Sequence, residues 1–177
     1  ALLGDVIYAG GAFTELDGQS RNHIAAIDRI TGEVTSWNPN ANGIVQSLAI
    51  AGNQLLATGP FTEMGGQPRK WLVAVDLTSG RVTDWNPKPD DPVNAFATIS
   101  DRVYVAGRFT EIAGESHRRL AALDVLTGQA APWNASADDE LYALTIAGSS
   151  LYVGGGFRNL SGQLRDNLAA VDIATGN

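Results

Sequence analysis

Short apolar runs separated by turn-forming residues fill the chain, and they recur in the same order every 48 residues without an insertion. Runs of four to seven residues, bounded by Gly, Asn, Asp and Pro, are typical of β-strands. No segment offers ten or more residues of helical periodicity free of Gly or Pro. A fixed period of this length is the mark of a repeat architecture. We therefore expect an all-β repeat protein without a substantial helix.

Alignment at this period places the same residue types in the same columns. The shared positions are Phe13, Phe61, Phe109 and Phe157; Asp28, Asp76, Asp124 and Asp172; Gly32, Gly80, Gly128 and Gly176; and Trp37, Trp85 and Trp133. The units run approximately over residues 1–43, 44–91, 92–139 and 140–177, so that 177/48 gives about 3.7 repeats in one segment.

Each unit contains four apolar runs, here named A to D. The expected strands are A at 45–50, 93–99 and 141–146; B at 7–11, 103–107 and 151–155; C at 24–28, 72–76, 120–124 and 168–172; and D at 34–37 and 82–85. The C-to-D connection, residues 28–32 in the first unit, predicts a hairpin in which Gly32 has a positive φ and the Asp28 and Thr31 side chains bond local backbone. The second Gly of run B predicts a close approach of neighbouring backbone.

Four short strands per unit at this spacing are typical of β-propeller blades. The Tyr-Val-Gly-Gly of residues 152–155 and the Ala-Ala-Leu-Asp-x-x-Thr-Gly of residues 121–128 resemble a kelch-type blade. Residues 26–37 are similar to the tryptophan-docking motif of quinoprotein propellers, and the recurring Phe-Thr-Glu and Trp-Asn-Pro elements resemble bacterial repeat propellers. The resemblance implies a β-propeller of four-stranded antiparallel blades, partial or completed in an oligomer, in an extracellular or cell-surface bacterial setting.

Residues that recur in every unit are expected to serve packing. The resemblance implies that Trp37, Trp85 and Trp133 lie over a neighbouring blade; stacking on a sugar is the alternative. The column of Asp28, Asp76, Asp124 and Asp172 suggests turn-capping carboxylates, with an ion pair to Arg21, Arg69 or Arg165 as a further possibility and catalysis as the alternative.

Binding residues are instead expected in loops and in columns that break the repeat. Blade geometry places the B-to-C and D-to-A connections on one face, which carries 11 of the 19 acidic residues. Asp138, Asp139 and Glu140 could supply oxygen ligands to Ca²⁺, although a solvated acidic rim is the favoured interpretation because their spacing matches no defined calcium loop. Trp71 breaks its column and lies beside Arg69 and Lys70. These residues, with His117 and Arg118, are the candidate partner-binding set, although Trp71 could also fill a local gap.

Charge and composition exclude several classes of function. Nineteen acidic against twelve basic residues give a net charge of −7, which disfavours nucleic acids and anionic membrane surfaces. No apolar run is long enough for a membrane helix, and the lack of Cys removes disulfides and thiolate sites. The sequence also lacks a nucleophile elbow, a phosphate-binding glycine loop and paired His ligands, so a catalytic role is not favoured.

The ends of the chain set the expected partners. The first unit begins at run B and the last ends after run C, which leaves 14 strands by this count and bare strand edges. We expect completion by further blades of a longer chain or by a second copy, as two chains could do in an eight-bladed ring. The leading hypothesis is a non-catalytic propeller scaffold that binds a protein or glycan. The alternatives are part of a secreted carbohydrate-active or oxidoreductase propeller enzyme and a self-assembling structural repeat.

Overall fold

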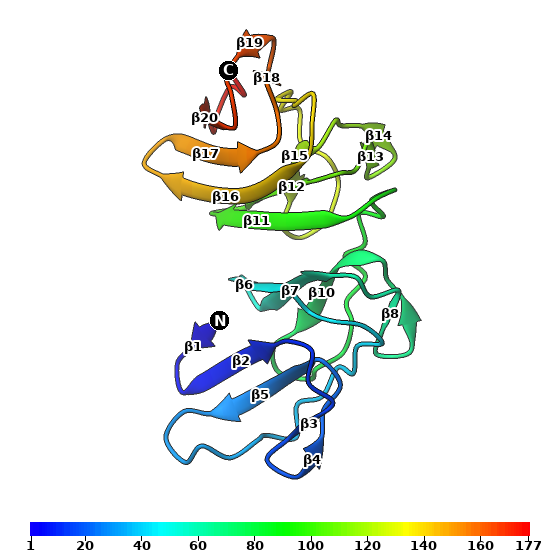
Figure 1. The fold of residues 1–177 in the computed structure, drawn as a ribbon. Coiled ribbons are helices and arrows are strands. Elements are labelled where there is room, and N and C mark those ends of the chain that lie inside the picture. The colour runs from blue at the N-terminus through cyan, green and yellow to red at the C-terminus, as the bar shows by residue number, and fades with distance from the viewer. The chain divides into compact units, whose positions relative to one another are not determined.

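The computed structural model describes all 177 residues, and every regular element in it is a β-strand. Its longer strands are β2 (Val6–Gly10), β5 (Ile24–Asp28), β6 (Ser47–Ala51), β7 (Gln54–Gly59), β10 (Trp71–Asp76), β11 (Val93–Ile99), β12 (Arg102–Gly107), β15 (Leu120–Asp124), β16 (Leu141–Ala147), β17 (Ser150–Gly155) and β20 (Leu168–Asp172). The chain divides into two compact units, Ala1–Asn86 and Pro87–Asn177, each of which holds two repeats (Figure 1). The structure contains no helix with the length and apolar character needed to cross a membrane.

The longer strands form one antiparallel three-stranded sheet per repeat. The strand orders are β1-β2-β5, where β1 is Leu2–Leu3, then β6-β7-β10, β11-β12-β15 and β16-β17-β20. Run B lies in the middle of each sheet, between runs A and C. Successive residues of a strand point to opposite faces of the sheet. Tyr8 therefore lies on one face with its partner Ala26, and Ile7 lies on the other face with its partner Ile27.

Run D is not a full strand, so the predicted four-stranded sheets contain three strands and a bridged outer segment. Val34 forms a single bridge with Ile27, and Thr35 N–H donates to the Ala26 carbonyl at 2.9 Å. The Thr35 hydroxyl then accepts the Trp37 N–H at 3.3 Å. The third repeat has the same single bridge, between Leu123 and Ala130, although Ala131 replaces Thr35 there.

Each predicted B-to-C loop contains a hairpin of two two-residue strands. These strands are β3 (Glu15–Leu16) with β4 (Gln19–Ser20), β8 (Glu63–Met64) with β9 (Gln67–Pro68), β13 (Glu111–Ile112) with β14 (Glu115–Ser116), and β18 (Asn159–Leu160) with β19 (Gln163–Leu164). A strand of two residues is too short to show an alternation of apolar and polar positions, so these elements were not predicted. The complete repeat is therefore a three-stranded sheet with a small hairpin between its second and third long strands.

Two glycine predictions agree with the backbone. Gly32, Gly80, Gly128 and Gly176 end the C-to-D turns with φ between 70° and 81°. At the end of run B, a Cβ on Gly59 would collide with the carbonyl oxygen of Ile44. A side chain is excluded there because the obstacle is backbone, which cannot rotate away.

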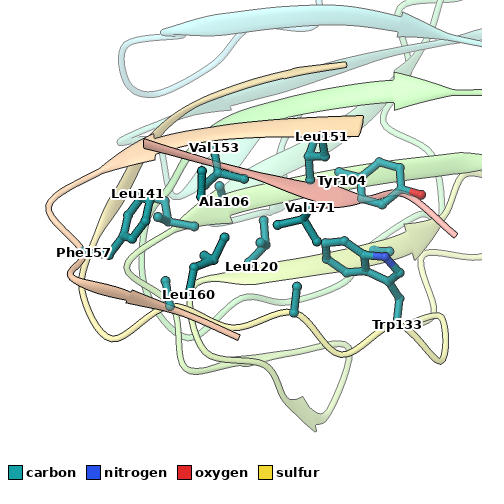
Figure 2. Packing of buried hydrophobic residues seen from close by; sticks show 14 of the residues in the cluster. Tyr104, Ala106, Leu120, Trp133, Leu141, Leu151, Val153, Phe157, Leu160 and Val171 are labelled. Atoms are coloured by element: carbon teal, nitrogen blue, oxygen red, sulfur yellow. The ribbon is translucent and has the colours of Figure 1, made fainter. Parts of the chain in front are cut away.

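The hydrophobic core of each unit lies between the faces of its two sheets. In the second unit, Tyr104, Ala106, Leu120 and Ala122 pack against the next sheet (Figure 2). The facing residues of that sheet are Leu151, Val153, Ala169 and Val171. The first unit repeats the arrangement with Tyr8, Ile24 and Ala26 against Leu55, Ala57, Val73 and Val75. We call these the Tyr face and the Leu face of a sheet: within each unit, the Tyr face of one repeat covers the Leu face of the next.

Candidate functional site

The sheet β16-β17-β20 leaves its Tyr face uncovered. Tyr152 is 42% exposed and Leu168 is 67% exposed, whereas their counterparts one repeat earlier, Tyr104 and Leu120, are 3% and 0% exposed. Ala170 is exposed as well, while Ala122 is buried. The same side chains thus form core in the third repeat and solvent-facing apolar surface in the fourth.

The sheet β1-β2-β5 presents the opposite surface, a partly uncovered Leu face in which Ile7 is exposed, Ala9 and Ile27 are half-buried and Ala25 is buried. Its members Ile7, Ala9, Ala25 and Ile27 occupy the columns of Leu151, Val153, Ala169 and Val171. Ile7 is 37% exposed, and Leu2, which pairs with it on the same face, is 58% exposed. The two end sheets therefore carry complementary halves of the junction found inside each unit.

The repeated tryptophans fasten these junctions. The Trp37 ring meets Tyr8 edge to face with centroids 5.1 Å apart, and its Nε1 donates to the Asp76 carbonyl at 3.1 Å. In the second unit the Trp133 ring lies beside Tyr104 (Figure 2), with centroids 5.1 Å apart. Its Nε1 donates to the Asp172 carbonyl at 3.3 Å. Each of these rings thus joins its own repeat to the next one. Trp85 is buried like the other two.

The tyrosine hydroxyls cross the same junctions. Tyr104 donates to the Ile173 carbonyl at 2.8 Å, and Tyr8 reaches the Leu77 carbonyl at 3.4 Å. Burial raises the pKa of both phenols, so each remains a protonated donor at neutral pH. Tyr152 occupies the same column, and the structure gives its hydroxyl no such acceptor across a junction.

The four repeated aspartates cap the C-to-D turns. Asp28 Oδ1 accepts the backbone N–H groups of Ile30 and Thr31, both at 2.8 Å. The hydrogen bond from the Thr31 backbone, followed by that from Ile30, holds the Asp28 pKa below its usual value. The pKa values of Asp76, Asp124 and Asp172 are lowered in the same way, led by bonds from Ser79, Thr127 and Thr175 respectively.

The arginine column bonds carbonyl groups rather than these aspartates. Arg21 Nη2 donates to the Thr35 carbonyl at 2.6 Å and to Gln19 Oε1 at 2.8 Å, and Arg69 makes the equivalent bond to the Thr83 carbonyl at 2.9 Å. The alternative of an ion pair between Arg21 and Asp28 is therefore not found. In the third repeat the position belongs to His117, which is 6% exposed and lies 3.7 Å from Glu115.

A second capping column was not recognised in the sequence. Asp138 Oδ1 accepts the N–H groups of Arg158 and Asn159 at 2.9 and 3.0 Å, which fastens the connection before one sheet to the hairpin that follows. Asp90 caps Thr110 and Glu111 likewise, and Asn42 caps Thr62 and Glu63. The signal was present, because residues 42, 90 and 138 share one column and are Asn, Asp and Asp.

These hydrogen bonds lower the pKa values of the Asp138 and Asp90 carboxyls. The Asn159 N–H is the largest influence that lowers the Asp138 pKa. For Asp90, burial alone would raise the pKa, but bonds from Glu111 and Thr110 outweigh it and lower the pKa.

The three proposed calcium ligands point to different partners. Asp138 caps the hairpin, Asp139 Oδ1 accepts the Glu140 N–H at 2.8 Å, and Glu140 Oε1 accepts from the Asn94 amide at 2.9 Å. No group of three or more His, Cys, Asp or Glu side chains is placed to hold a metal ion. The Ca²⁺ site remains a prediction from the sequence.

The candidate partner-binding residues fall into two places. Arg118 lines a polar groove of about 560 Å³ together with Arg119, Glu111 and Asp138. His117, the residue before Arg118, is buried. Arg69 is committed to internal bonds, Lys70 is exposed, and Trp71 is half-buried at the start of β10.

Trp71 occupies a column with an unusual backbone. Its φ is 66°, and His23, Arg119 and Asn167 in the same column have φ values of 65°, 67° and 64°. Every repeat therefore demands a left-handed residue here, although four different non-glycine residues supply it. Asn167 and His23 each place a side-chain nitrogen near the carbonyl of the residue twelve positions earlier, at 2.9 and 3.2 Å.

Comparisons with known proteins inform the fold only. No protein-family model matches the chain, and no curated protein matches it. Among solved structures, the chain is similar to the computationally designed Ika4 protein, with a TM-score of 0.63 and 13% identity over 98% of this chain and 88% of that one. It is also similar to the computationally designed Ika8 protein, with a TM-score of 0.60 and 14% identity over 100% of this chain and 58% of that one.

The chain thus spans somewhat more than half the length of Ika8. At these identities the likeness extends to the fold and carries no activity. Together with the geometry, the comparisons show an all-β protein of repeated small antiparallel sheets.

Proposed function

We propose that this chain is a non-catalytic β-propeller segment whose repeats are blades and whose two uncovered faces associate with a second copy of the chain. The 48-residue period, the pairing of Tyr face on Leu face and the Trp–Tyr junctions support the propeller arrangement. In this view the chain acts as an assembly and scaffold module.

The observation that carries the proposal is the contrast between Tyr104 and Tyr152. Tyr104 is buried in a junction between sheets, whereas Tyr152, in the same column of the repeat, is open to solvent. An apolar sheet face exposed in this way is an interaction surface by its composition. We propose a second copy as the occupant because the Leu face of β1-β2-β5 matches it column for column and is partly exposed, at Ile7 and Leu2.

The repeat also specifies the contacts of that junction. Tyr8 reaches residue 77 and Tyr104 reaches residue 173, a separation of 69 positions in each case. The column of Ile173 contains Arg29 in the first repeat, because 173 − 144 = 29. We expect the Tyr152 hydroxyl of one copy to donate to the Arg29 carbonyl of the next, while Leu168 and Ala170 cover Ile7 and Ile27.

Sedimentation equilibrium tests the association. The proposal predicts a mass above the 18.6 kDa of one chain. It also predicts that Leu168→Glu returns the mass to that of one chain, because a carboxylate would be placed in an apolar junction. Leu164→Glu is the matched control: Leu164 is 79% exposed, lies in the hairpin β18-β19, and should not alter the mass. A wild-type mass of 18.6 kDa at micromolar concentration would rule out the second copy as partner.

A second candidate function is the binding of a protein or glycan at the loop edge. The polar groove beside Arg118 favours it, since two guanidinium groups and two carboxylates line one cavity. A glycan array would show binding that Arg118→Ala abolishes and Lys70→Ala leaves unchanged. The absence of binding to any glycan would remove the glycan version.

A further inference from the structure

The polar groove of the third repeat has a lining without a single apolar residue. It has a volume of about 560 Å³, and its lining consists of Thr110, Glu111, Ser116, Arg118, Arg119 and Asp138. A volume of this size is within the range of sites that hold small ligands. On the basis of the glycan binding proposed for this loop edge, we propose that the groove takes a uronate-containing glycan whose carboxylate pairs with Arg118.

Arg118 and Glu111 are the charged residues of the groove that lack a partner. Both are exposed, and neither side chain takes part in a hydrogen bond or an ion pair within the chain. Because these opposite charges line one groove without pairing, each is free to bind a ligand. A matching ligand presents an anion to Arg118 and hydrogen-bond donors to Glu111.

Arg119 and Asp138 are instead held in place by the protein. Arg119 Nη1 donates to the Ala137 carbonyl at 3.1 Å, and Asp138 Oδ1 accepts the Asn159 N–H at 3.0 Å. The Asn159 N–H lowers the Asp138 pKa most, and the positive charge of Arg119 lowers it further. The charges of these two residues therefore offset one another, which leaves Arg118 as the cation that an incoming anion meets.

The lining favours a sugar acid over a peptide. Peptides are recognised largely through side chains in apolar pockets, and no apolar side chain lines this groove. A uronate ring carries one carboxylate, which matches the planar fork of a guanidinium, and several hydroxyls, which can donate to Glu111. Ser116 lies opposite Glu111 in the hairpin β13-β14 and offers a further hydroxyl. A sugar that carried only hydroxyls would leave Arg118 without an anion.

Glu111 also determines the orientation of the sugar. A ligand carboxylate beside Glu111 would meet a like charge, so the carboxylate should lie at Arg118 and the ring hydroxyls at Glu111 and Ser116. The other repeats offer no second site of this kind, because none has arginine in the Arg118 column. The residues there are Asn22, Lys70 and Asp166. We therefore expect one uronate site per chain.

Calorimetric titration of the intact chain with defined trisaccharides tests this inference. The probes are trimers of galacturonate, glucuronate and mannuronate, each compared with its methyl ester, which keeps the ring hydroxyls and removes the charge. We expect at least one trimer to bind at one site per chain. Its ester should bind about tenfold or more weakly, because a charge-assisted pair is lost.

Variants of the protein should reproduce the effect of the ester. Arg118→Ala should weaken the acid trimer about tenfold or more and change the affinity for the ester little. Arg81→Ala is the matched control, since Arg81 is exposed, follows the second C-to-D turn and does not line the groove. Ser116→Leu should abolish binding by filling the groove, and the hairpin should accept it because Leu164 occupies the same column.

Equal affinity for an acid trimer and its ester would overturn the inference, as would the failure of all three acid trimers to bind. If a glycan array showed neutral glycans bound through Arg118, the uronate would be wrong and the proposed glycan binding at the loop edge would stand. Absence of binding to every glycan would remove both.

Discussion

The indole Nε1 of Trp37 donates to the main-chain carbonyl of Asp76, 39 residues further along, at 3.1 Å. Trp133 repeats the bond with Asp172 over the same separation. Each ring also lies edge to face with a tyrosine of its own repeat. One side chain thus holds two consecutive sheets together, by apolar burial and by a bond to the carbonyl that begins the C-to-D turn of the next repeat.

Trp133→Phe keeps an aromatic ring but loses the N–H that donates to the Asp172 carbonyl. We expect it to destabilise the protein by about 1–3 kcal/mol. Trp133→Ala should cost about 3–5 kcal/mol through loss of the buried ring. Urea unfolding measures both. Leu126→Ala is the control, since Leu126 is 75% exposed and its loss should change little. If the Phe variant were as stable as wild type, the hydrogen bond would not contribute to the free energy of unfolding.

Acid should destabilise the fold through its capping carboxyls. Asp28, Asp76, Asp124 and Asp172 have pKa values below the usual value of about 3.9 in the folded chain, so the unfolded chain binds protons first as the pH falls. Their contribution is complete above about pH 4 and is lost as the pH falls through the folded pKa values.

The thermal midpoint followed between pH 7 and pH 3 should therefore drop below about pH 4. A variant with Asn at all four positions keeps the acceptor oxygen but cannot titrate, so its midpoint should fall less steeply over this range. Equal slopes for the two proteins would show that other carboxyls cause the acid effect.

Asp138→Ala should cost about 1–2 kcal/mol, because two backbone N–H groups of the following hairpin lose their acceptor. Asp138→Asn should be close to wild type, since Asn42 performs the same capping in the first unit. Thermal unfolding of the two variants distinguishes the capping role from a role of the charge. A Ca²⁺ site would predict instead that Asn and Ala both remove a calcium-dependent rise in the midpoint.

Trp71→Asn should leave the thermal midpoint unchanged or raise it. Asn adopts a positive φ more readily than a bulky residue. Asn167 in the same column also bonds the Gly155 carbonyl, and the substituted side chain could bond the Gly59 carbonyl in the same way. Trp71→Val should lower the midpoint, because β-branched residues resist this conformation. A large loss of stability in Trp71→Asn would mean that the ring is needed for packing.

The sequence alone was sufficient for the long strands, because the apolar run of Ile24–Asp28 recurs in every repeat. The sequence was insufficient for features that depend on tertiary contacts rather than on the repeat period. Val34, Val82 and Ala130 each form one isolated bridge instead of a fourth strand. The strands of the small hairpins have only two residues each and are too short to show an alternation of apolar and polar positions. The left-handed column that includes Trp71 and Asn167 has no common residue type to reveal it.

The candidate surfaces were foreseeable only in part. The repeat arithmetic predicted open ends and a second copy or further blades as partners. It could not assign Tyr152 to the exposed face, because this depends on which side of the sheet the neighbouring repeat covers. That side is set by packing of the Tyr face, with Tyr104 and Leu120, on the Leu face that holds Leu151.

Photo-crosslinking from position 152 tests the central claim most directly. A benzoylphenylalanine in place of Tyr152 keeps an aromatic ring in the uncovered face, and an equal mixture of isotopically light and heavy chains distinguishes links between copies from links within one. The proposed junction predicts light–heavy crosslinks that map to the residues around Arg29, with none from the same probe placed at Leu164. Crosslinks confined to one chain, or scattered with no preference for the sheet β1-β2-β5, would contradict the association of the two uncovered faces.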